Sequence, residues 1–321
     1  MSNPLVHKIP NCPLCGNNVP TTGERFVIQQ LDLQVRVVEC PVCGLVYKEY
    51  VPSEILTSAI YGGDYVHYKQ ADGASEKSSE ERVGRMGRPS GLRHLDYGCG
   101  GGGLTRCAMR LGWDSYGVDP FLPECLSSGP HGARFFKASA ESGLIRKIGA
   151  FDRISMWAVI EHLNQPLATF QGLAGCLKPG GRILFNAPNA DSLIARRNGA
   201  SWGIALLLEH LTFWTEKSIR YLAQQAGLDI VAIKRCGTPY PFGKSVPSWR
   251  SFGLREPLGE TAIQFEKLET SDLRTGSVQG RILQFGQLIA RDALAGRFFR
   301  LALQLFGIGD HFYAVFQKKD G

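Results

Sequence analysis

The chain of 321 residues is 44% hydrophobic and 20% charged, which is the composition of an ordinary soluble protein of about two domains. No apolar run reaches the roughly 18 residues that span a bilayer, so we expect no transmembrane helix. The formal net charge of +7 is spread along the chain. It is compatible with an acidic or phosphorylated substrate and equally with simple surface solubility.

Two C-P-x-C-G knuckles lie near the start of the chain, at residues 12–16 and 40–44. Such pairs are typical of zinc ribbons and rubredoxin-like sites, in which four thiolates close a tetrahedral shell around a structural metal. Disulfides are the poorer interpretation, because residues 1–20 lack the apolar core of a secretory signal and the other cysteines show no pairing pattern. The sequence predicts a small zinc domain over residues 1–50, with iron less favoured and with these ligands: Cys12, Cys15, Cys40 and Cys43.

Residues 51–90 are expected to connect this domain to the next one. They include a tyrosine-rich stretch with Tyr61, Tyr65 and Tyr68, and they continue from Lys69 to Gly91 as a polar segment. Charged side chains at helical spacing and a G-R-P-S-G end predict a helical linker.

An apolar segment that ends in Asp96 runs into five glycines within residues 98–103. After a strand, glycines permit a turn with positive φ and let backbone N–H groups approach a ligand at the start of the next helix. The D-x-G-x-G-x-G spacing differs from the dinucleotide fingerprint G-x-G-x-x-G, and it lacks the Lys and the Ser/Thr of a phosphate loop. The loop resembles the first motif of S-adenosylmethionine-dependent methyltransferases of the Rossmann-like class.

Further landmarks follow at the spacing of that family. Asp119 ends a second apolar run about 20 residues beyond the loop, an E-H-L stretch follows the strand-like residues 151–157, and an L-K-P-G-G turn precedes another strand. Short strands alternate with helices, which predicts a parallel sheet covered on both sides. The resemblance covers about residues 90–236. It implies an α/β, doubly wound, seven-stranded methyltransferase sheet with its core at residues 91–236.

Ligands of such sheets bind beyond the carboxyl ends of the strands. In the family, an acidic residue at the position of Asp119 accepts hydrogen bonds from a ribose diol, and a helix cap is the alternative role. Residues after the third strand meet the adenine, where this chain has Ser139 in place of a frequent acidic residue. The resemblance implies S-adenosylmethionine as cofactor and these binding residues: Asp96, Gly98, Cys99, Gly100, Gly102, Asp119, Pro120, Ser139, Ala140, Met156 and Trp157.

Two Glu-His pairs are candidates for proton transfer in the cleft. Glu161 and His162 stand where the family commonly has such a pair beside the cofactor, with capping or packing as the alternative. Glu209 and His210 lie in a stretch that resembles the E-H-L segment of zinc-knuckle-bearing sugar C-methyltransferases, where the pair is linked to proton transfer. We predict His210 as the catalytic base, assisted by Glu209. The upstream tyrosines either cover the cofactor or substrate site or form a packing cluster.

The remainder departs from the family pattern. Residues 237–305 are interpreted as a helical insertion, and residues 306–321 contain a last core strand at His311–Lys318. Apolar and basic faces within residues 281–306 predict a lid or a homodimer contact, with a peripheral membrane contact as the alternative.

These patterns predict a cytoplasmic enzyme that methylates a small molecule, with a sugar nucleotide, a surface-glycan intermediate or a specialised metabolite as the favoured acceptor. Nucleic-acid methylation is the rival hypothesis, because a zinc ribbon accompanies positive charge. The sequence after strand four lacks the N/D-P-P-Y/F segment whose ring stacks on a flipped base, which weighs against that rival. A non-catalytic module that binds the cofactor is the third hypothesis.

Overall fold

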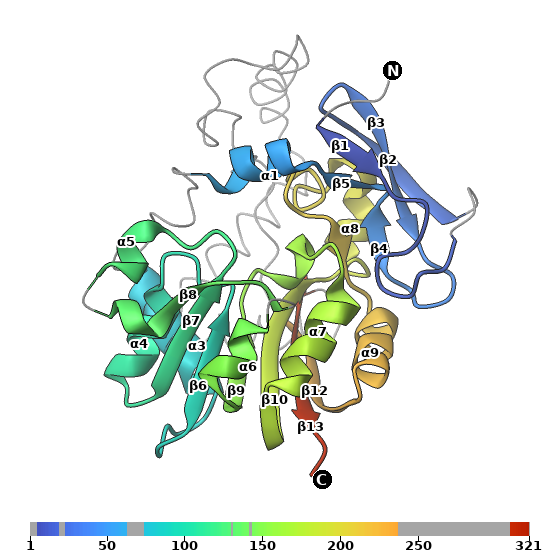
Figure 1. Ribbon diagram of the computed structural model, residues 1–321. Coiled ribbons are helices and arrows are strands. Elements are labelled where there is room, and N and C mark those ends of the chain that lie inside the picture. The colour runs from blue at the N-terminus through green and yellow to red at the C-terminus, as the bar shows by residue number, and fades with distance from the viewer. Residues whose placement is uncertain are drawn as a thin grey trace, which may run out of the picture.

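The computed structural model describes residues 5–18, 23–62, 74–129, 131–140, 143–236 and 309–320 (Figure 1). The helix expected within residues 281–306, together with Tyr65 and Tyr68, lies outside these ranges. Among the helices that are described, none combines the length and the apolar character needed to cross a bilayer.

A seven-stranded sheet forms the centre of the molecule, in the order β8-β7-β6-β9-β10-β13-β12 (Figure 1). Strands β6 to β10 run parallel, and β13 is antiparallel to both of its neighbours. This order confirms the predicted doubly wound α/β class. The chain builds the sheet outward in one direction from β6 and then in the other from β9, so the strand order reverses between these two parallel strands. The strands are β6 (Arg93–Tyr97), β7 (Asp114–Asp119), β8 (Phe135–Lys137), β9 (Phe151–Met156), β10 (Leu177–Pro188), β12 (Leu228–Cys236) and β13 (His311–Lys318).

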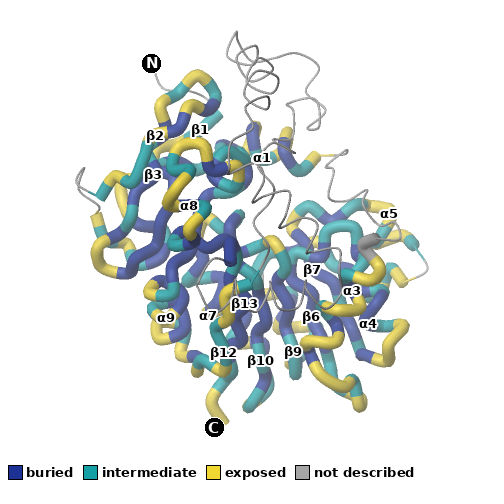
Figure 2. The backbone as a smooth tube through the Cα atoms, turned by 180° about the vertical axis from the view of Figure 1, so that it is seen from behind, coloured by how far each residue is buried: buried dark blue, intermediate teal, exposed yellow. Residues whose placement is uncertain are grey.

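Helices cover both faces of this sheet, whose central strands are mostly buried (Figure 2). Phe185 packs with Phe170 of α7, whereas the preceding residue Leu184 packs with Val83 of α3, because neighbouring strand residues face opposite sides. One face carries α6 (Leu144–Ile148), α7 (Pro166–Gly175) and α9 (Glu216–Gln225), and the other carries α3 (Ala74–Arg85) and α4 (Gly103–Arg110). Shorter helices are α5 (Glu124–Ser127), η2 (Gly132–Arg134), η4 (Ile160–His162), α8 (Leu193–Asn198) and η5 (Gly199–Ser201).

The N-terminal region forms a second sheet that takes one strand from the core. It contains β2 (Glu24–Gln30), β3 (Leu33–Glu39) and β4 (Val46–Lys48), and its fourth strand is β11 (Thr212–Phe213). A pair of short strands, β1 (Val6–Lys8) and β5 (Tyr50–Pro52), precedes α1 (Glu54–Tyr61). The boundary at residue 50 stays a prediction, but the region before it shares a sheet with residues far along the chain.

A common apolar core joins the two regions. Leu14 of the first knuckle and Leu45, which follows the second, belong to the same buried cluster as Trp214, which directly follows β11. Thr215 caps the start of α9, and its hydroxyl also donates to the carbonyl oxygen of Gly44 at 2.9 Å. The second knuckle is therefore packed against α9. Metal binding alone would not require this contact.

The two knuckle glycines offer a matched test of this contact. Gly16 and Gly44 both have positive φ, at 72° and 75°, so alanine costs about 1 kcal/mol at either position. A Cβ at Gly16 meets open space, whereas one at Gly44 would lie 2.9 Å from Lys217 Cδ and 3.1 Å from Thr215 Oγ1. We expect Gly44→Ala to lower the free energy of unfolding by about 1 kcal/mol more than Gly16→Ala does, measured by urea denaturation. Equal losses would contradict the packing.

Candidate functional site

The four knuckle cysteines converge on one point. The Sγ atoms of Cys12 and Cys43 lie 3.5 Å apart. Those of Cys15 and Cys40 lie 3.4 Å apart, and all four sulfur atoms fall within 4.8 Å of one another. A tetrahedral ion with metal–sulfur bonds of about 2.3 Å places its ligand atoms roughly 3.8 Å apart. The four side chains therefore fit a tetrahedral metal ion.

Thiol chemistry agrees with this fit. The hydrogen bond with Cys43 lowers the pKa of Cys12, which favours a thiolate there. Three of the cysteines are buried and Cys15 is partly exposed. Thiolates are the metal-binding form, and four protein ligands leave no open position for a substrate. The donor set suits a structural zinc ion.

The glycine loop lies between β6 and α4, at the carboxyl edge of the central sheet. Gly98, Gly100 and Gly102 have positive φ angles of 75°, 50° and 73°. A Cβ on Gly98 would lie 2.4 Å from a methyl carbon of Val159, so glycine is needed for the segment after β9 to approach the loop. Cys99, between the glycines, is buried in a small apolar cluster.

Asp96 lies beneath this loop. It is 3% exposed, and its two oxygens accept hydrogen bonds from Thr105 and Ser155, both at 3.0 Å. Burial raises the pKa of Asp96 to about 6, although both hydroxyl groups oppose the shift. The carboxylate thus fastens α4 to β6 and β9, and a direct cofactor contact from it stays a prediction.

Asp119 ends β7 and holds the loop from the side. Its oxygens accept hydrogen bonds from the backbone N–H groups of Gly100 at 2.9 Å and Phe121 at 2.8 Å. Asp119 therefore holds the turn and does not cap the next helix, α5, whose N-cap is Pro123. The carboxylate also stands where doubly wound folds bind a ribose. The other predicted residues that follow β7 and β8, all exposed or half-buried, are Pro120, Ser139 and Ala140.

The last two predicted cofactor residues turn to opposite sides of the sheet. Met156 is fully buried in the core on the α7 face. The ring of Trp157 lies on the α3 face and stacks on Tyr313, with centroids 5.8 Å apart. The two side chains therefore lie on opposite faces of the sheet, and a cofactor contact from either residue stays a prediction.

Both candidate histidines meet in one cluster. The rings of His162 and His210 lie edge to face, with centroids 4.9 Å apart. His162 Nδ1 lies 2.9 Å from the carbonyl oxygen of Glu209 and 3.1 Å from the Tyr61 hydroxyl. Tyr61, at the end of α1, also stacks on Phe121 at 4.7 Å. Tyr61 therefore contacts both the histidine cluster and the turn that follows Asp119.

Two buried carboxyl groups flank these rings. Glu161 and Glu209 are 2% and 3% exposed, and the Oε2 atom of each has no hydrogen-bond partner among the described residues. Burial raises the pKa of Glu161 to about 7 and raises that of Glu209 as well. Ligand atoms of Glu161, His162 and His210 lie within 4.8 Å of one another. The carboxyl group of Glu161, with its raised pKa, therefore lies beside two imidazole rings.

Sequence reasoning missed Lys48, a fully buried lysine on β4. Its Nζ donates to Gln30 Oε1 at 2.9 Å and to the carbonyl oxygen of Leu207 at 2.7 Å. Burial lowers the pKa of Lys48 to about 7, and the charge of Glu209 opposes this shift. The N-terminal sheet thus places a positive charge where it acts on Glu209. Nothing in the V-Y-K-E-Y stretch around Lys48 distinguishes it from an exposed lysine.

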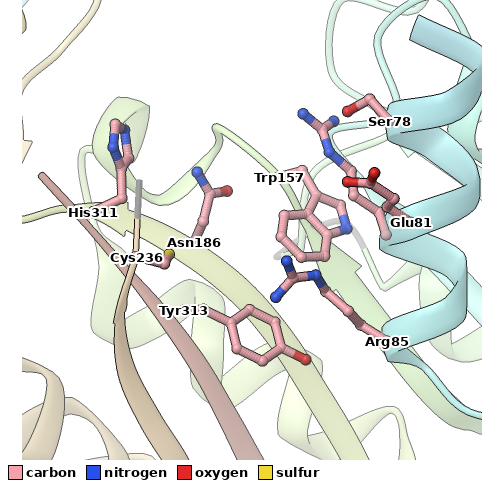
Figure 3. A pocket seen from close by; sticks show the side chains of 9 residues that line it. Ser78, Glu81, Arg85, Trp157, Asn186, Cys236, His311 and Tyr313 are labelled. Carbon is pink, nitrogen blue, oxygen red and sulfur yellow. The ribbon is translucent and has the colours of Figure 1, made fainter. Parts of the chain in front are cut away.

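A cavity of about 270 Å³ opens between α3 and the sheet (Figure 3). The Arg82 guanidinium lies 5.4 Å from the Trp157 ring centroid, and that of Arg85 lies 5.0 Å from the Tyr313 ring. Sequence reasoning missed this site, for which the spacing of two arginines in the linker was the only signal. The other lining residues are Ser78, Glu81, Asn186, Cys236 and His311.

Comparison with known proteins finds a family model, described as a methyltransferase domain, that matches residues 69–233, just over half of the chain. The ubiquinone biosynthesis O-methyltransferase of Xanthomonas axonopodis pv. citri (strain 306) is 33% identical over 117 residues, which are 34% of this chain and 48% of that protein. The protein of the same name from Escherichia coli O9:H4 (strain HS) is 30% identical over 135 residues, 40% and 53% of the respective lengths. The chain spans about half the length of these curated relatives.

Solved structures with a similar backbone include a SAM-dependent methyltransferase from Archaeoglobus fulgidus. It has a TM-score of 0.45 at 14% identity, covering 82% of this chain and 99% of that chain. The magnesium protoporphyrin IX methyltransferase of Synechocystis PCC 6803, solved with bound SAH, has a TM-score of 0.45 at 17% identity, covering 57% and 93%.

The burial of Glu161 predicts a pH-dependent stability. Its pKa rises from 4.5 to about 7 on folding, so the folded chain binds the proton more tightly than the unfolded chain does. The free energy of unfolding should therefore fall by about 3 kcal/mol as pH rises from 4.5 through 7. The glutamine of Glu161→Gln cannot titrate. Relative to wild type, the free energy of unfolding of this variant should therefore be higher at pH 8 than at pH 5 by about the same amount, measured by urea unfolding. A difference independent of pH would contradict this prediction.

Proposed function

Because the chain belongs to the methyltransferase domain family, we propose that it transfers the methyl group of S-adenosylmethionine to a small-molecule acceptor. The observation that carries the proposal is the D-x-G-x-G-x-G loop at the end of β6, fastened to Asp119 at the end of β7 by a 2.9 Å hydrogen bond from Gly100. The two elements with which such folds hold a nucleoside are therefore joined at one edge of the sheet.

The proposed cofactor contacts follow from this edge. Asp119 would accept hydrogen bonds from the ribose hydroxyls, and the turn at residues 139–140 would lie beside the adenine. The N-terminus of α4 would face the cofactor's carboxylate, because free N–H groups and the helix dipole favour an anion there. When bound, S-adenosylmethionine supplies an electrophilic methyl group. The chain's own work is then to align the acceptor and to take up its proton.

We propose a hydroxyl oxygen as the methyl acceptor. The curated relatives carry the name O-methyltransferase, and a hydroxyl must lose a proton when its oxygen is methylated. The cluster of His162, His210 and Glu161 brings three proton-accepting groups within reach of one another, and burial raises the pKa of Glu161 to about 7. We propose His210 as the base, with the Glu209 side chain acting through its charge.

The class of acceptor is a finer proposal. A sugar nucleotide, a surface-glycan intermediate or a specialised metabolite agrees with the small-molecule chemistry in the relatives' names. Mass spectrometry of metabolite pools incubated with the protein and methyl-labelled S-adenosylmethionine would identify the acceptor. Labelling of RNA or DNA in place of a small molecule would favour the nucleic-acid alternative.

A structural zinc ion is the proposed occupant of the four-cysteine cluster. A small region built on two knuckles buries little apolar surface, so metal binding would supply much of its folding free energy. Its packing against α9 means that the ion would also support the sheet shared with β11.

Cofactor binding predicts a stability gain in the presence of S-adenosylhomocysteine. At a concentration of about 100 times Kd, this product should stabilise the folded chain by about 2.7 kcal/mol, which calorimetry detects as a higher Tm. Asp119→Ala should remove most of the shift. Asp114→Ala, at the opposite end of β7, should lower the starting Tm and keep the shift. A wild-type Tm indifferent to both S-adenosylmethionine and its product would overturn the proposed function.

The proposed base predicts a selective loss of turnover. His210→Ala should lower kcat by about 10²-fold, the usual effect of losing a general base, while the Kd for S-adenosylhomocysteine stays nearly unchanged. Labelled methyl incorporation gives the first value and calorimetry the second. The exposed His131 provides a control variant, His131→Ala, with wild-type turnover. Full activity of His210→Ala, or an equal loss of cofactor binding, would make His210 structural.

Metal content tests the cysteine cluster. Elemental analysis of reduced protein should find about one zinc ion per chain, and Cys40→Ser should lose it together with the ordered N-terminal sheet. Cys125→Ser, at an exposed cysteine away from the knuckles, should retain the ion. Purified protein without a tightly bound metal would refute this assignment.

A further inference from the structure

The cavity beside α3 holds more positive than negative charge. Arg82 and Arg85 both line it. Neither forms an ion pair or a side-chain hydrogen bond within the described part of the chain. Each guanidinium instead lies against an aromatic ring. Burial lowers the pKa of Arg82, the charge of the buried Asp96 opposes this shift, and the nearby charge of Arg85 adds to it. Two arginines without a carboxylate partner leave their hydrogen-bond donors available to a ligand.

The other charged groups of the cavity leave this excess in place. Glu81 is exposed to solvent and offers one negative charge. Burial lowers the pKa of His311, but its hydrogen bond to Asp310 at 2.9 Å, together with that carboxylate's charge, outweighs burial and raises the pKa. His311 and Asp310 therefore balance each other, and Glu81 is the one carboxylate among the residues that line the cavity. The buried Asp96, which does not line it, also acts on Arg82 through its charge.

The cavity lies mostly in the half of the sheet away from the glycine loop, although Trp157, a predicted cofactor residue, is among its lining residues. The glycine loop, Asp119 and residues 139–140 follow β6, β7 and β8, on one side of β9. The cavity takes Asn186 from β10 and His311 from β13, on the other side of β9. The two halves meet at residues 157–159, where Val159 approaches the glycine loop and the Ala158 N–H donates to Asn186 at 2.7 Å.

Resting on the proposed function, we propose that this cavity binds an anionic group of the methyl acceptor, a carboxylate or a phosphate, through Arg82 and Arg85. Guanidinium groups bind both anions through paired hydrogen bonds. The rings of Trp157 and Tyr313 hold the two guanidinium groups in place, as Figure 3 shows for Arg85 and these rings. Less side-chain freedom is then lost when the anion binds. Asn186 adds an amide that can donate to the same group.

Small probes test the charge preference directly. Protein saturated with S-adenosylhomocysteine would be titrated by calorimetry with benzoate, with phenyl phosphate and with benzyl alcohol, a neutral molecule of similar size. We expect at least one anion to bind with a Kd on the order of 1 mM and at least tenfold more tightly than the alcohol. The tighter anion distinguishes a carboxylate from a phosphate acceptor. Equal binding of the alcohol, or no binding of either anion, would overturn the proposal.

Variants locate the binding and separate it from cofactor binding. Arg85→Gln should weaken the anion about tenfold, and the double variant with Arg82→Gln should abolish the preference for anions. Arg88→Gln removes an exposed charge just beyond α3 and should behave as wild type. Variants that weaken S-adenosylhomocysteine and spare the probes would assign the arginines to the cofactor and refute the proposal. Anion binding in a protein indifferent to S-adenosylhomocysteine would refute the proposed function and retain an anion site.

Discussion

The strand pairing between β11 and β4 is the contact on which both functional centres depend. Phe213 pairs with Val46, and the adjoining backbone continues the connection on either side. Lys48 N–H donates to the carbonyl oxygen of Leu211 at 3.0 Å, and Leu211 N–H donates to the carbonyl oxygen of Glu161 at 2.8 Å. Residues 211–213 therefore link the N-terminal sheet to the turn that carries Glu161 and His162. Loss of this pairing would disturb both.

The buried lysine of the N-terminal sheet strengthens the same connection. Removing a charged amine from water is costly unless it is paired and hydrogen-bonded. The hydrogen bonds that Lys48 donates to Gln30 and to the carbonyl oxygen of Leu207, two residues before Glu209, offset part of this desolvation cost. Tyr50 also donates to Gln30 at 2.6 Å, so the network is anchored on β5 as well. The cysteine-bearing region is therefore part of the electrostatic environment around the second Glu-His pair.

Local patterns predicted the parts of the molecule that depend on local geometry. The knuckle spacing places four thiols together, and the glycine spacing fits a loop whose residues need positive φ. The paired positions of Lys48 and Glu209, or of Arg85 and Tyr313, depend on how distant segments meet, and no spacing in the sequence encodes them. Trp157 illustrates a third case. Its place after β9 is the family's cofactor position, but alternation along the strand sends its ring to the opposite face from Met156.

The contacts of His162 determine which of its nitrogens carries a proton. A carbonyl oxygen only accepts hydrogen bonds, so the 2.9 Å contact with Glu209 favours a hydrogen on Nδ1, and the Tyr61 hydroxyl at 3.1 Å from the same nitrogen can then accept from it. Contacts with two segments of the chain hold the ring in one orientation. Little reorganisation of this ring would then accompany the proton transfer proposed for the neighbouring His210.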